Sequence, residues 1–442
     1  MASYLNHHPF IFYLLIIYTI SISISISISI SISTTSALFL PKALVLTVVK
    51  DPSTLQYTTK LIQRTPQPLS LDLGTPISWV ICDNRYISST YHPAYCGSPQ
   101  CTLANSKLCR TCPPPAKPGC NNNTCTTTSL NNPFTNIIIS PPGGTELATD
   151  IVRIPTTDGS NPGQLVTVPN HLFVCAPKSL LQGLAKGVSG VAGLGRSKIS
   201  LPSQVSSYFR FPRKFTLCLP PLTESGVVFF GDVTYNFNPP GGAASANLSY
   251  TLLVANPFRP SDYFIGVQGI KVGGEDVPSV NKSKLSINSK GNGGTMISLS
   301  HPYTIMETSI YKAITTIFNE QLTTVVKRVN PVAPFQFCYD SNTIGFSPIG
   351  PMVQDIDLVL QSKEVKWTIA PLNSMVRMND KAYCLGILDG GNNPSTSIII
   401  GGFQIEDNLL QFDLDKSMIG FGSSLIYNRM RCSNFNFTSN VI

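Results

Sequence analysis

Hydrophobic and polar residues alternate over short stretches along most of the chain, and clusters of Pro, Gly, Asn and Ser separate these stretches. A period of two residues is typical of β-strands that bury one face. The pattern predicts strands at residues 45–50, 55–62, 69–73, 79–82, 166–169, 172–175, 215–219, 227–231, 263–272, 357–360, 365–369, 397–400 and 409–414. It predicts helices at residues 200–209 and 302–324. We therefore expect an all-β fold with few short helices.

The composition supports this interpretation and indicates an extracellular protein. Of the 442 residues, 42% are hydrophobic and only 12% are charged. Soluble domains usually carry about a quarter charged residues, so a helix-rich cytosolic protein is disfavoured. Apolar runs along the whole length exclude a disordered chain, because they can bury a large core. The net charge of +8 is spread along the chain without the interleaved aromatic residues of a nucleic-acid site, and we expect no nucleic-acid partner.

The N-terminus has the pattern of a secretory signal peptide. The first 36 residues contain no Lys, Arg, Asp or Glu, and an apolar run leads into six Ser-Ile pairs that end at Ile32. Small polar residues follow, which predicts a signal peptide at 1–36 with cleavage near Ser36 or Ala37. The alternative is an uncleaved signal anchor that spans the membrane. Cleavage predicts a protein secreted to the extracellular space, apoplast or cell wall, without a membrane partner.

The twelve cysteines have two possible interpretations. Seven of them lie between Cys82 and Cys125, and their spacing would suggest a zinc site in a cytosolic chain. In a secreted chain an even number of cysteines predicts disulfides. Spacing does not fix the pairing, although Cys338 and Cys384 are expected partners within the second half. The predicted disulfide cysteines are Cys82, Cys96, Cys101, Cys109, Cys112, Cys120, Cys125, Cys175, Cys218, Cys338, Cys384 and Cys432, and no metal or other cofactor is expected.

Four Asn-x-Ser/Thr sequences predict N-glycosylation of a secreted surface. They begin at Asn122, Asn247, Asn281 and Asn436.

A pair of motifs occurs once in each half of the chain. Residues 68–80 read PLSLDLGTPISWV and residues 189–195 read SGVAGLG. In the second half, residues 293–300 read GGTMISLS and residues 398–402 read IIIGG. Each half thus has a turn motif on a strand, followed by apolar residues and Gly about 120 residues later in the first half and about 100 residues later in the second. The repeat predicts two β-rich lobes at 37–235 and 247–442, joined by a linker at 236–246.

These motifs resemble the pepsin-like aspartic proteinase family, and above all its plant branch of extracellular dermal glycoproteins, basic 7S globulins, and xylanase and xyloglucanase inhibitors. The resemblance runs from about residue 43 to 439 and rests on short motifs in a shared order. They include VICD at 80–83, PGCNNNT at 118–124, LPSQ at 201–204, DLVLQS at 357–362, NSMV at 373–376 and NFNFTS at 434–439. The resemblance implies a pepsin-like bilobal double-ψ β-barrel fold with the Cys-rich segment as an insertion in the first lobe.

The same resemblance implies that proteinase chemistry is lost. The mechanism needs two carboxylates about 3 Å apart that share one proton. The motifs place Asp72 at the first position but Ser298 at the second, and a hydroxyl cannot take the role of the second carboxylate. The flap region 141–147 also lacks the Tyr of active members. Both residues are therefore interpreted as vestigial, with Asp72 a buried carboxylate inside an inherited turn.

Other catalytic arrangements are disfavoured. Outside the signal peptide the chain has only His92, His171 and His301, and no G-x-S-x-G motif surrounds a nucleophile. Asp83 and Asp389 are interpreted as loop caps.

Members of the plant branch inhibit microbial glycoside hydrolases, so the resemblance implies a partner of the endoglucanase or xylanase type. A guanidinium can pair with the carboxylates of such an enzyme. Candidate inhibitory loops are 327–331, with Lys327 and Arg328, and 390–396, with Asn393 and Ser395. The simpler interpretation of Arg328 is a solvated charge near a helix C-terminus. Relatives carry a cation in the second loop, and Ser395 cannot supply one.

The expected function is therefore inhibition of a cell-wall-degrading glycoside hydrolase, of the xyloglucan-specific endo-β-glucanase type, in plant defence. One alternative is a basic 7S globulin-like binding or storage protein that recognises a peptide or polysaccharide. An active aspartic endopeptidase is the other alternative, and Ser298 argues against it.

Overall fold

The computed structural model describes residues 40–63, 66–82, 86–237, 248–322, 326–362, 364–422 and 425–438. Residues Lys42–Ile442 form one compact unit, as judged by the contacts between their Cα atoms. The predicted signal peptide, Asp83, Asn247 and most of the predicted linker lie outside the described residues. No helix in the described part of the chain is long and apolar enough to cross a membrane.

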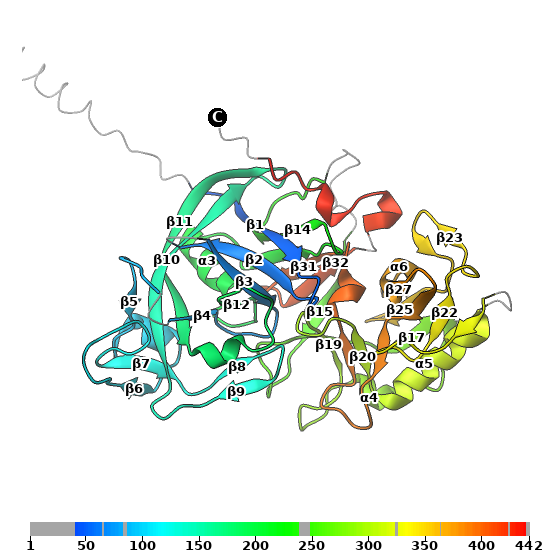
Figure 1. The fold of residues 1–442 in the computed structure, drawn as a ribbon, viewed down its shortest axis with the longest axis horizontal. Helices are drawn as coiled ribbons and strands as arrows, with labels where there is room; N and C mark the ends of the chain where they lie inside the picture. The colour runs from blue at the N-terminus through cyan, green and yellow to red at the C-terminus, as the bar shows by residue number, and fades with distance from the viewer. Residues whose placement is uncertain are drawn as a thin grey trace, which may run out of the picture. The chain divides into compact units, whose positions relative to one another are not determined.

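The all-β prediction is confirmed, since strands dominate both halves (Figure 1). The strands of the first half outside the Cys-rich segment are β1 (Ala43–Lys50), β2 (Tyr57–Ile62), β3 (Pro66–Asp72), β4 (Trp79–Ile81), β10 (Thr145–Thr157), β11 (Pro162–Ala176), β12 (Gly190–Gly193), β13 (Lys214–Cys218) and β14 (Ser225–Gly231). Strand β1 pairs with β14 and β2, and β10 and β11 form the long hairpin that is prominent in Figure 1. Helix α3 (Leu201–Phe209) has Pro202 in its first turn, where the missing N–H costs nothing.

The second half has shorter strands and the longest described helix, α5 (Thr308–Gln321). Its strands include β15 (Ser249–Val254), β16 (Tyr263–Ile265), β17 (Gly269–Val272), β18 (Glu275–Asp276), β19 (Thr295–Ile297), β20 (Thr304–Met306), β21 (Arg328–Val329), β22 (Cys338–Asp340), β23 (Phe346–Ser347) and β24 (Gly350–Pro351). They continue with β25 (Ile356–Val359), β26 (Lys366–Ile369), β27 (Met375–Asn379), β28 (Ala382–Leu385), β29 (Ile387–Asp389), β30 (Ile398–Ile400), β31 (Leu409–Asp413) and β32 (Met418–Phe421). Two single-turn helices, α4 (Lys282–Leu285) and α6 (Pro371–Ser374), complete the main elements.

The repeated motifs occupy equivalent positions in two pairs of parallel strands. Strand β3 runs parallel to β12 and places Asp72 opposite Gly193. Strand β19 runs parallel to β30 and pairs Ile297 with Ile400, so Ser298 follows at the same point of its pair. The sequence repeat therefore corresponds to a structural repeat.

Strands of the two halves pair in one sheet, and both halves contribute to one hydrophobic core. Strand β13 pairs with β31 along its whole length, and the rings of Phe215 and Phe412 stack with their centroids 4.7 Å apart. A disulfide joins Cys218 to Cys432 in the same region. The halves are therefore tied by both backbone and side-chain contacts.

The Cys-rich segment forms small elements attached to β10. They are β5 (His92–Pro93), α2 (Pro99–Leu103), β6 (Leu108–Arg110), β7 (Thr124–Thr127), β8 (Leu130–Asn132) and β9 (Ile137–Ile139). Three disulfides lie within the segment: Cys96–Cys109, Cys101–Cys125 and Cys112–Cys120. Cys82–Cys175 fastens its start to β11, and Cys338 pairs with Cys384 as the sequence indicated. The described cysteines are all paired, so the zinc alternative is wrong.

Four element predictions need correction. The helix predicted at 302–324 begins only at Thr308, because residues 304–306 pair with β29 and β30 and Glu307 then caps the helix through the Ser309 N–H at 2.9 Å. The strand predicted at 263–272 is two strands, β16 and β17, which belong to different sheets. Conversely, the predicted strands 166–169 and 172–175 are parts of the single strand β11.

Candidate functional site

Asp72 ends strand β3 and its carboxylate is buried in the turn that follows. The residue is 2% exposed. Its Oδ2 accepts hydrogen bonds from the N–H of Gly74 at 3.0 Å, from the N–H of Thr75 at 2.7 Å and from the Thr75 hydroxyl at 2.7 Å. Burial raises the pKa of Asp72, and the hydrogen bonds offset part of that rise. These three donors all belong to the turn, so they give the carboxylate a structural role.

Ser298 follows strand β19 and lies in a cluster of neutral polar groups. Its hydroxyl is 2.9 Å from the hydroxyl of Ser300 and 3.0 Å from Nδ1 of His301, and it accepts a hydrogen bond from the Ser300 N–H at 3.2 Å. Burial lowers the pKa of His301, which favours the neutral imidazole. The partners of Ser298 are thus hydroxyl, amide and imidazole groups.

A second carboxylate approaches the Asp72 turn from a residue that the sequence did not indicate. Asp262 lies immediately before β16, and a Cβ added to Gly74 would be 2.5 Å from its Oδ1 and 3.6 Å from Oδ2 of Asp72. The two carboxylates therefore both lie beside Gly74. Burial raises the pKa of Asp262 to about 6, with a further contribution from Asp72 and an opposing one from Arg259. No local motif marks Asp262, because its surroundings come from distant parts of the chain.

The flap segment is attached to the Cys-rich segment at the start of β10. Gly143 and Gly144 both have a φ of 77°. The Arg110 side chain packs beside Gly143, and its Nη1 donates to the carbonyl of Gly144 at 3.2 Å. Strand β10 continues this attachment by pairing Thr145 with Thr127.

We expect Gly144→Ala to lower the free energy of unfolding by about 2 kcal/mol. The new Cβ would lie 2.5 Å from the Thr126 hydroxyl and 2.6 Å from the Thr127 carbonyl, at a φ of 77°. Gly97→Ala is the matched control, since Gly97 has a φ of 78° but nothing within 4 Å of the added Cβ. Denaturant unfolding should show the greater loss for Gly144→Ala, and equal losses would contradict the crowding at the flap.

The predicted loop at 327–331 is in part a strand. Arg328 lies in β21 opposite Tyr339 of β22, and its exposed guanidinium lies 4.8 Å from the centroid of the Phe337 ring. Lys327 donates its N–H to the Thr343 hydroxyl at 3.0 Å. Helix α5 ends at Gln321, so the interpretation of Arg328 as a charge at a helix C-terminus is wrong. The ring instead orients the guanidinium through a cation–π contact.

The loop at 390–396 connects β29 to β30 and is held at both ends. Asp389 accepts hydrogen bonds from the Thr308 hydroxyl at 2.6 Å and from the Gly391 N–H at 3.0 Å, which makes it the loop cap that the sequence predicted. Asn393 is exposed with a φ of 53°, and Ser395 is also exposed.

A distant arginine contacts this loop. Arg259 donates to the hydroxyl of Thr396 at 2.7 Å and to the carbonyl of Ser395 at 3.3 Å, and lies 4.9 Å from the centroid of the Phe264 ring. A cation is therefore present beside Ser395 although the loop itself contains none. Sequence reasoning missed Arg259 because 136 residues separate it from Ser395.

The predicted glycosylation sites that the structure describes differ in exposure. Asn122 and Asn281 are exposed, whereas Asn436 is partly buried. Glycosylation at these sites stays a prediction. No group of three or more His, Cys, Asp or Glu in the described part of the chain is arranged to hold a metal ion.

Two family models match the chain, one in each half. The model described as "Xylanase inhibitor N-terminal" matches residues 57–232, and "Xylanase inhibitor C-terminal" matches residues 262–423. The chain belongs to the xylanase inhibitor family. The N-terminal match contains Asp72, and the C-terminal match contains Asp262, Ser298, Arg328 and Ser395.

Similar proteins have names that do not mention xylanase inhibition. "Probable aspartic proteinase GIP2" from Nicotiana benthamiana is 50% identical over 416 residues, which cover 91% of this chain and 93% of that protein. "Gamma conglutin 1" from Prunus dulcis is 44% identical over 404 residues, which cover 90% of each chain.

Solved structures agree with the family assignment. The crystal structure of edgp has a TM-score of 0.87 at 48% identity and covers 91% of this xylanase inhibitor family member and 99% of its own chain. The aspartic proteinase from Irpex lacteus has a TM-score of 0.53 at 13% identity over 89% of this chain and 99% of its own, which shows the shared fold alone. The predicted family resemblance and pepsin-like fold are therefore confirmed.

Proposed function

We propose that this protein is a secreted, catalytically inactive relative of the aspartic proteinases that inhibits a microbial cell-wall-degrading glycoside hydrolase, of the xyloglucan-specific endo-β-glucanase type, in plant defence. The observation that carries the proposal is Ser298 at the point of the second parallel strand pair where the first pair has Asp72. Membership of the xylanase inhibitor family supports a glycoside hydrolase as the partner. The six disulfides suit an oxidising compartment outside the cell.

Two features support the absence of proteolysis. Hydrolysis needs one carboxylate to activate a water and a second to share its proton, and Ser298 is surrounded by neutral groups. The flap carries no Tyr, and Arg110 attaches it to the Cys-rich segment. Pepstatin-sensitive cleavage of a denatured protein at about pH 3 to 5 would contradict this part of the proposal.

The surface proposed to bind the enzyme comprises Lys327, Arg328 and the loop 390–396 with Asn393 and Ser395. The Arg328 guanidinium is exposed and is held against Phe337, so less side-chain freedom is lost when it pairs with a carboxylate. Arg259 donates hydrogen bonds to Ser395 and Thr396. We therefore assign it the role of holding the loop 390–396 in place, and not that of contacting the enzyme directly.

We expect Arg328→Ala to weaken inhibition of a sensitive endoglucanase at least tenfold, because a charge-assisted contact in the enzyme cleft is lost. Arg377→Ala is the matched control, since Arg377 is an exposed arginine on β27, at the opposite edge of the same small sheet. Inhibition constants should be measured for both variants against a panel of fungal endoglucanases and xylanases. If no panel enzyme is inhibited or bound by the wild-type protein, the inhibitor proposal fails. Binding of a peptide or polysaccharide in its place would then favour the globulin-like alternative.

A further inference from the structure

The Cys-rich segment is unexplained by the proposed function, and it forms one wall of a cavity in the first half of the chain. The cavity has a volume of about 510 Å³. The flap segment also lines the cavity, through Pro141, Gly144 and Thr145, and so does the end of strand β11, through Ala176 and the adjoining Pro177. This volume lies in the range of sites for small organic molecules, roughly 300 to 1,000 Å³.

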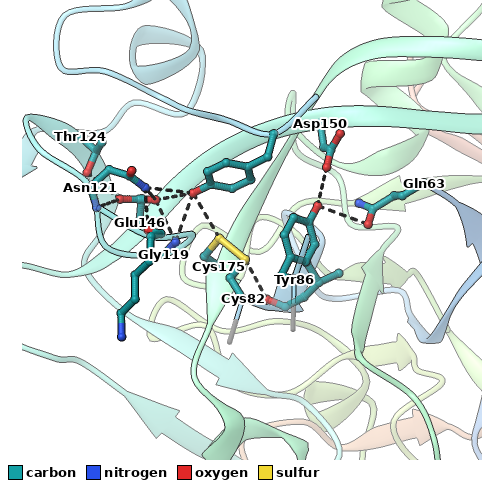
Figure 2. The surroundings of a disulfide bond; sticks show 12 residues. Gln63, Cys82, Tyr86, Gly119, Asn121, Thr124, Glu146, Asp150 and Cys175 are labelled. Carbon is teal, nitrogen blue, oxygen red and sulfur yellow. Dashed lines mark hydrogen bonds between the residues drawn. A yellow bond between two sulfur atoms is a disulfide. The ribbon is translucent and has the colours of Figure 1, made fainter. Parts of the chain in front are cut away.

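Covalent bridges and a buried carboxylate hold the cavity walls in place. The Cys82–Cys175 bridge lines the cavity, and Cys112–Cys120 fixes the turn from Lys117 to Cys120. Behind that turn Glu146 is fully buried and accepts hydrogen bonds from the N–H of Asn121 at 2.7 Å and the N–H of Gly119 at 3.1 Å (Figure 2). The site is therefore formed before any ligand arrives, which reduces the entropic cost of binding.

The charges and the apolar surface of the cavity suggest the class of ligand. Arg110 and Lys117 line it, and no Asp or Glu does. The carboxylate of Glu146 does not compete with a bound anion for Arg110 and Lys117. It already accepts hydrogen bonds from the turn and from the Tyr91 and Thr124 hydroxyls. Pro118, Ile139, Pro141 and Pro177 supply apolar walls of the kind that contact an aromatic ring or a short aliphatic chain.

We propose that this cavity binds a small organic anion, in which an apolar ring or chain enters between the prolines and one carboxylate or phosphate pairs with Arg110 and Lys117. Arg110 already donates through Nη1 to Gly144 and keeps its remaining guanidinium N–H groups for the ligand. Lys117 is exposed at the rim, where a lysine can attract an anion as a compact charge. This proposal does not rest on glycoside hydrolase inhibition, which was placed on the second half of the chain.

Calorimetric titration of the intact secreted protein with three probes tests the proposal. trans-Cinnamate supplies a ring with a carboxylate, phenyl phosphate a ring with a phosphate, and cinnamyl alcohol the same shape as cinnamate without charge. We expect at least one anion to bind with a dissociation constant of roughly 0.1 to 1 mM, and the alcohol to bind at least tenfold more weakly. The tighter of the two anions identifies the head group. Equal binding of the alcohol, or no heat from either anion at millimolar concentration, would overturn the proposal.

Two variants locate the binding in the cavity. Lys117→Gln removes one charge at an exposed position and should weaken anion binding about fivefold. Lys290→Gln removes a charge from an exposed loop of the second half and should leave binding unchanged. An unchanged dissociation constant in Lys117→Gln, with the fold intact by circular dichroism, would contradict the assignment. Arg110→Gln should cause a larger loss, and its unfolding curve separates lost binding from a loosened flap.

Discussion

Replacing Cys218 and Cys432 together with Ala is expected to lower the free energy of unfolding by about 5 kcal/mol. This bridge joins residues 214 positions apart, and both cysteines are fully buried. Cross-linking of so long a loop restricts the unfolded chain strongly, because the entropy of loop closure grows with loop length. The bridge also connects β13 of the first half to the C-terminal segment.

The local structure around Cys432 adds to this effect. Its N–H donates to Oδ1 of Asp407 at 2.8 Å, and Phe435 packs against Phe229 with the ring centroids 5.2 Å apart. Without the bridge, the C-terminal segment would be held only by such contacts. Limited proteolysis of the double variant should therefore cut first near residues 425–438.

The Cys112–Cys120 bridge provides the matched control for this experiment. It also removes two cysteines, but it closes only 8 residues, so the same chain-entropy argument gives about 2.5 kcal/mol. Denaturant unfolding of both double variants measures the difference between their free energies of unfolding. The comparison requires that the free energy of unfolding depend equally steeply on denaturant concentration in both variants. Equal losses, or a smaller loss for the Cys218–Cys432 pair, would show that the long bridge does not restrict the unfolded chain as proposed.

Strands β1 and β10 illustrate what the hydrophobic pattern detects and what it misses. Strand β1 was found because its apolar residues lead into an alternating end. Strand β10 was missed because Thr145–Thr157 is buried at most positions on both faces while containing Thr, Glu and Asp. Buried polar residues such as Glu146 and Asp150, whose hydrogen-bond partners come from other segments, remove the period of two that a strand prediction uses.

The candidate site shows the same limit. Asp72 and Ser298 could be located because each lies at the end of a strand within a short motif that repeats. Asp262 and Arg259 could not, because a carboxylate beside Gly74 and a guanidinium beside Ser395 acquire their importance only when distant segments pack together. Local motifs thus identify the inherited turns, whereas the charges around them depend on the tertiary fold.

Asp262→Asn is expected to raise the free energy of unfolding relative to wild type as the pH increases. The gain over wild type should be about 2 to 3 kcal/mol larger at pH 7.5 than at pH 4. Burial is the main cause that raises the pKa of Asp262 to about 6 in the folded protein, with Arg259 opposing the rise and Asp72 adding to it. In the unfolded chain an aspartate has a pKa of about 3.9. Between these two values the folded state binds more protons than the unfolded state, so this carboxyl group makes wild-type stability fall as the pH rises. Asparagine does not titrate and removes that fall.

The experiment must measure the difference in free energy of unfolding between variant and wild type at each pH. A second buried group changes the stability of both proteins with pH in the opposite direction. Burial lowers the pKa of His171 to about 4, so its contribution to stability is lost as the pH falls below about 6.5. This loss is common to both proteins and cancels in the difference. Asp276→Asn, at an exposed carboxylate paired with Lys271 at 3.5 Å, is the control and should follow the wild-type curve. If Asp262→Asn also follows it, Asp262 ionises in the folded protein without cost, and burial does not raise its pKa.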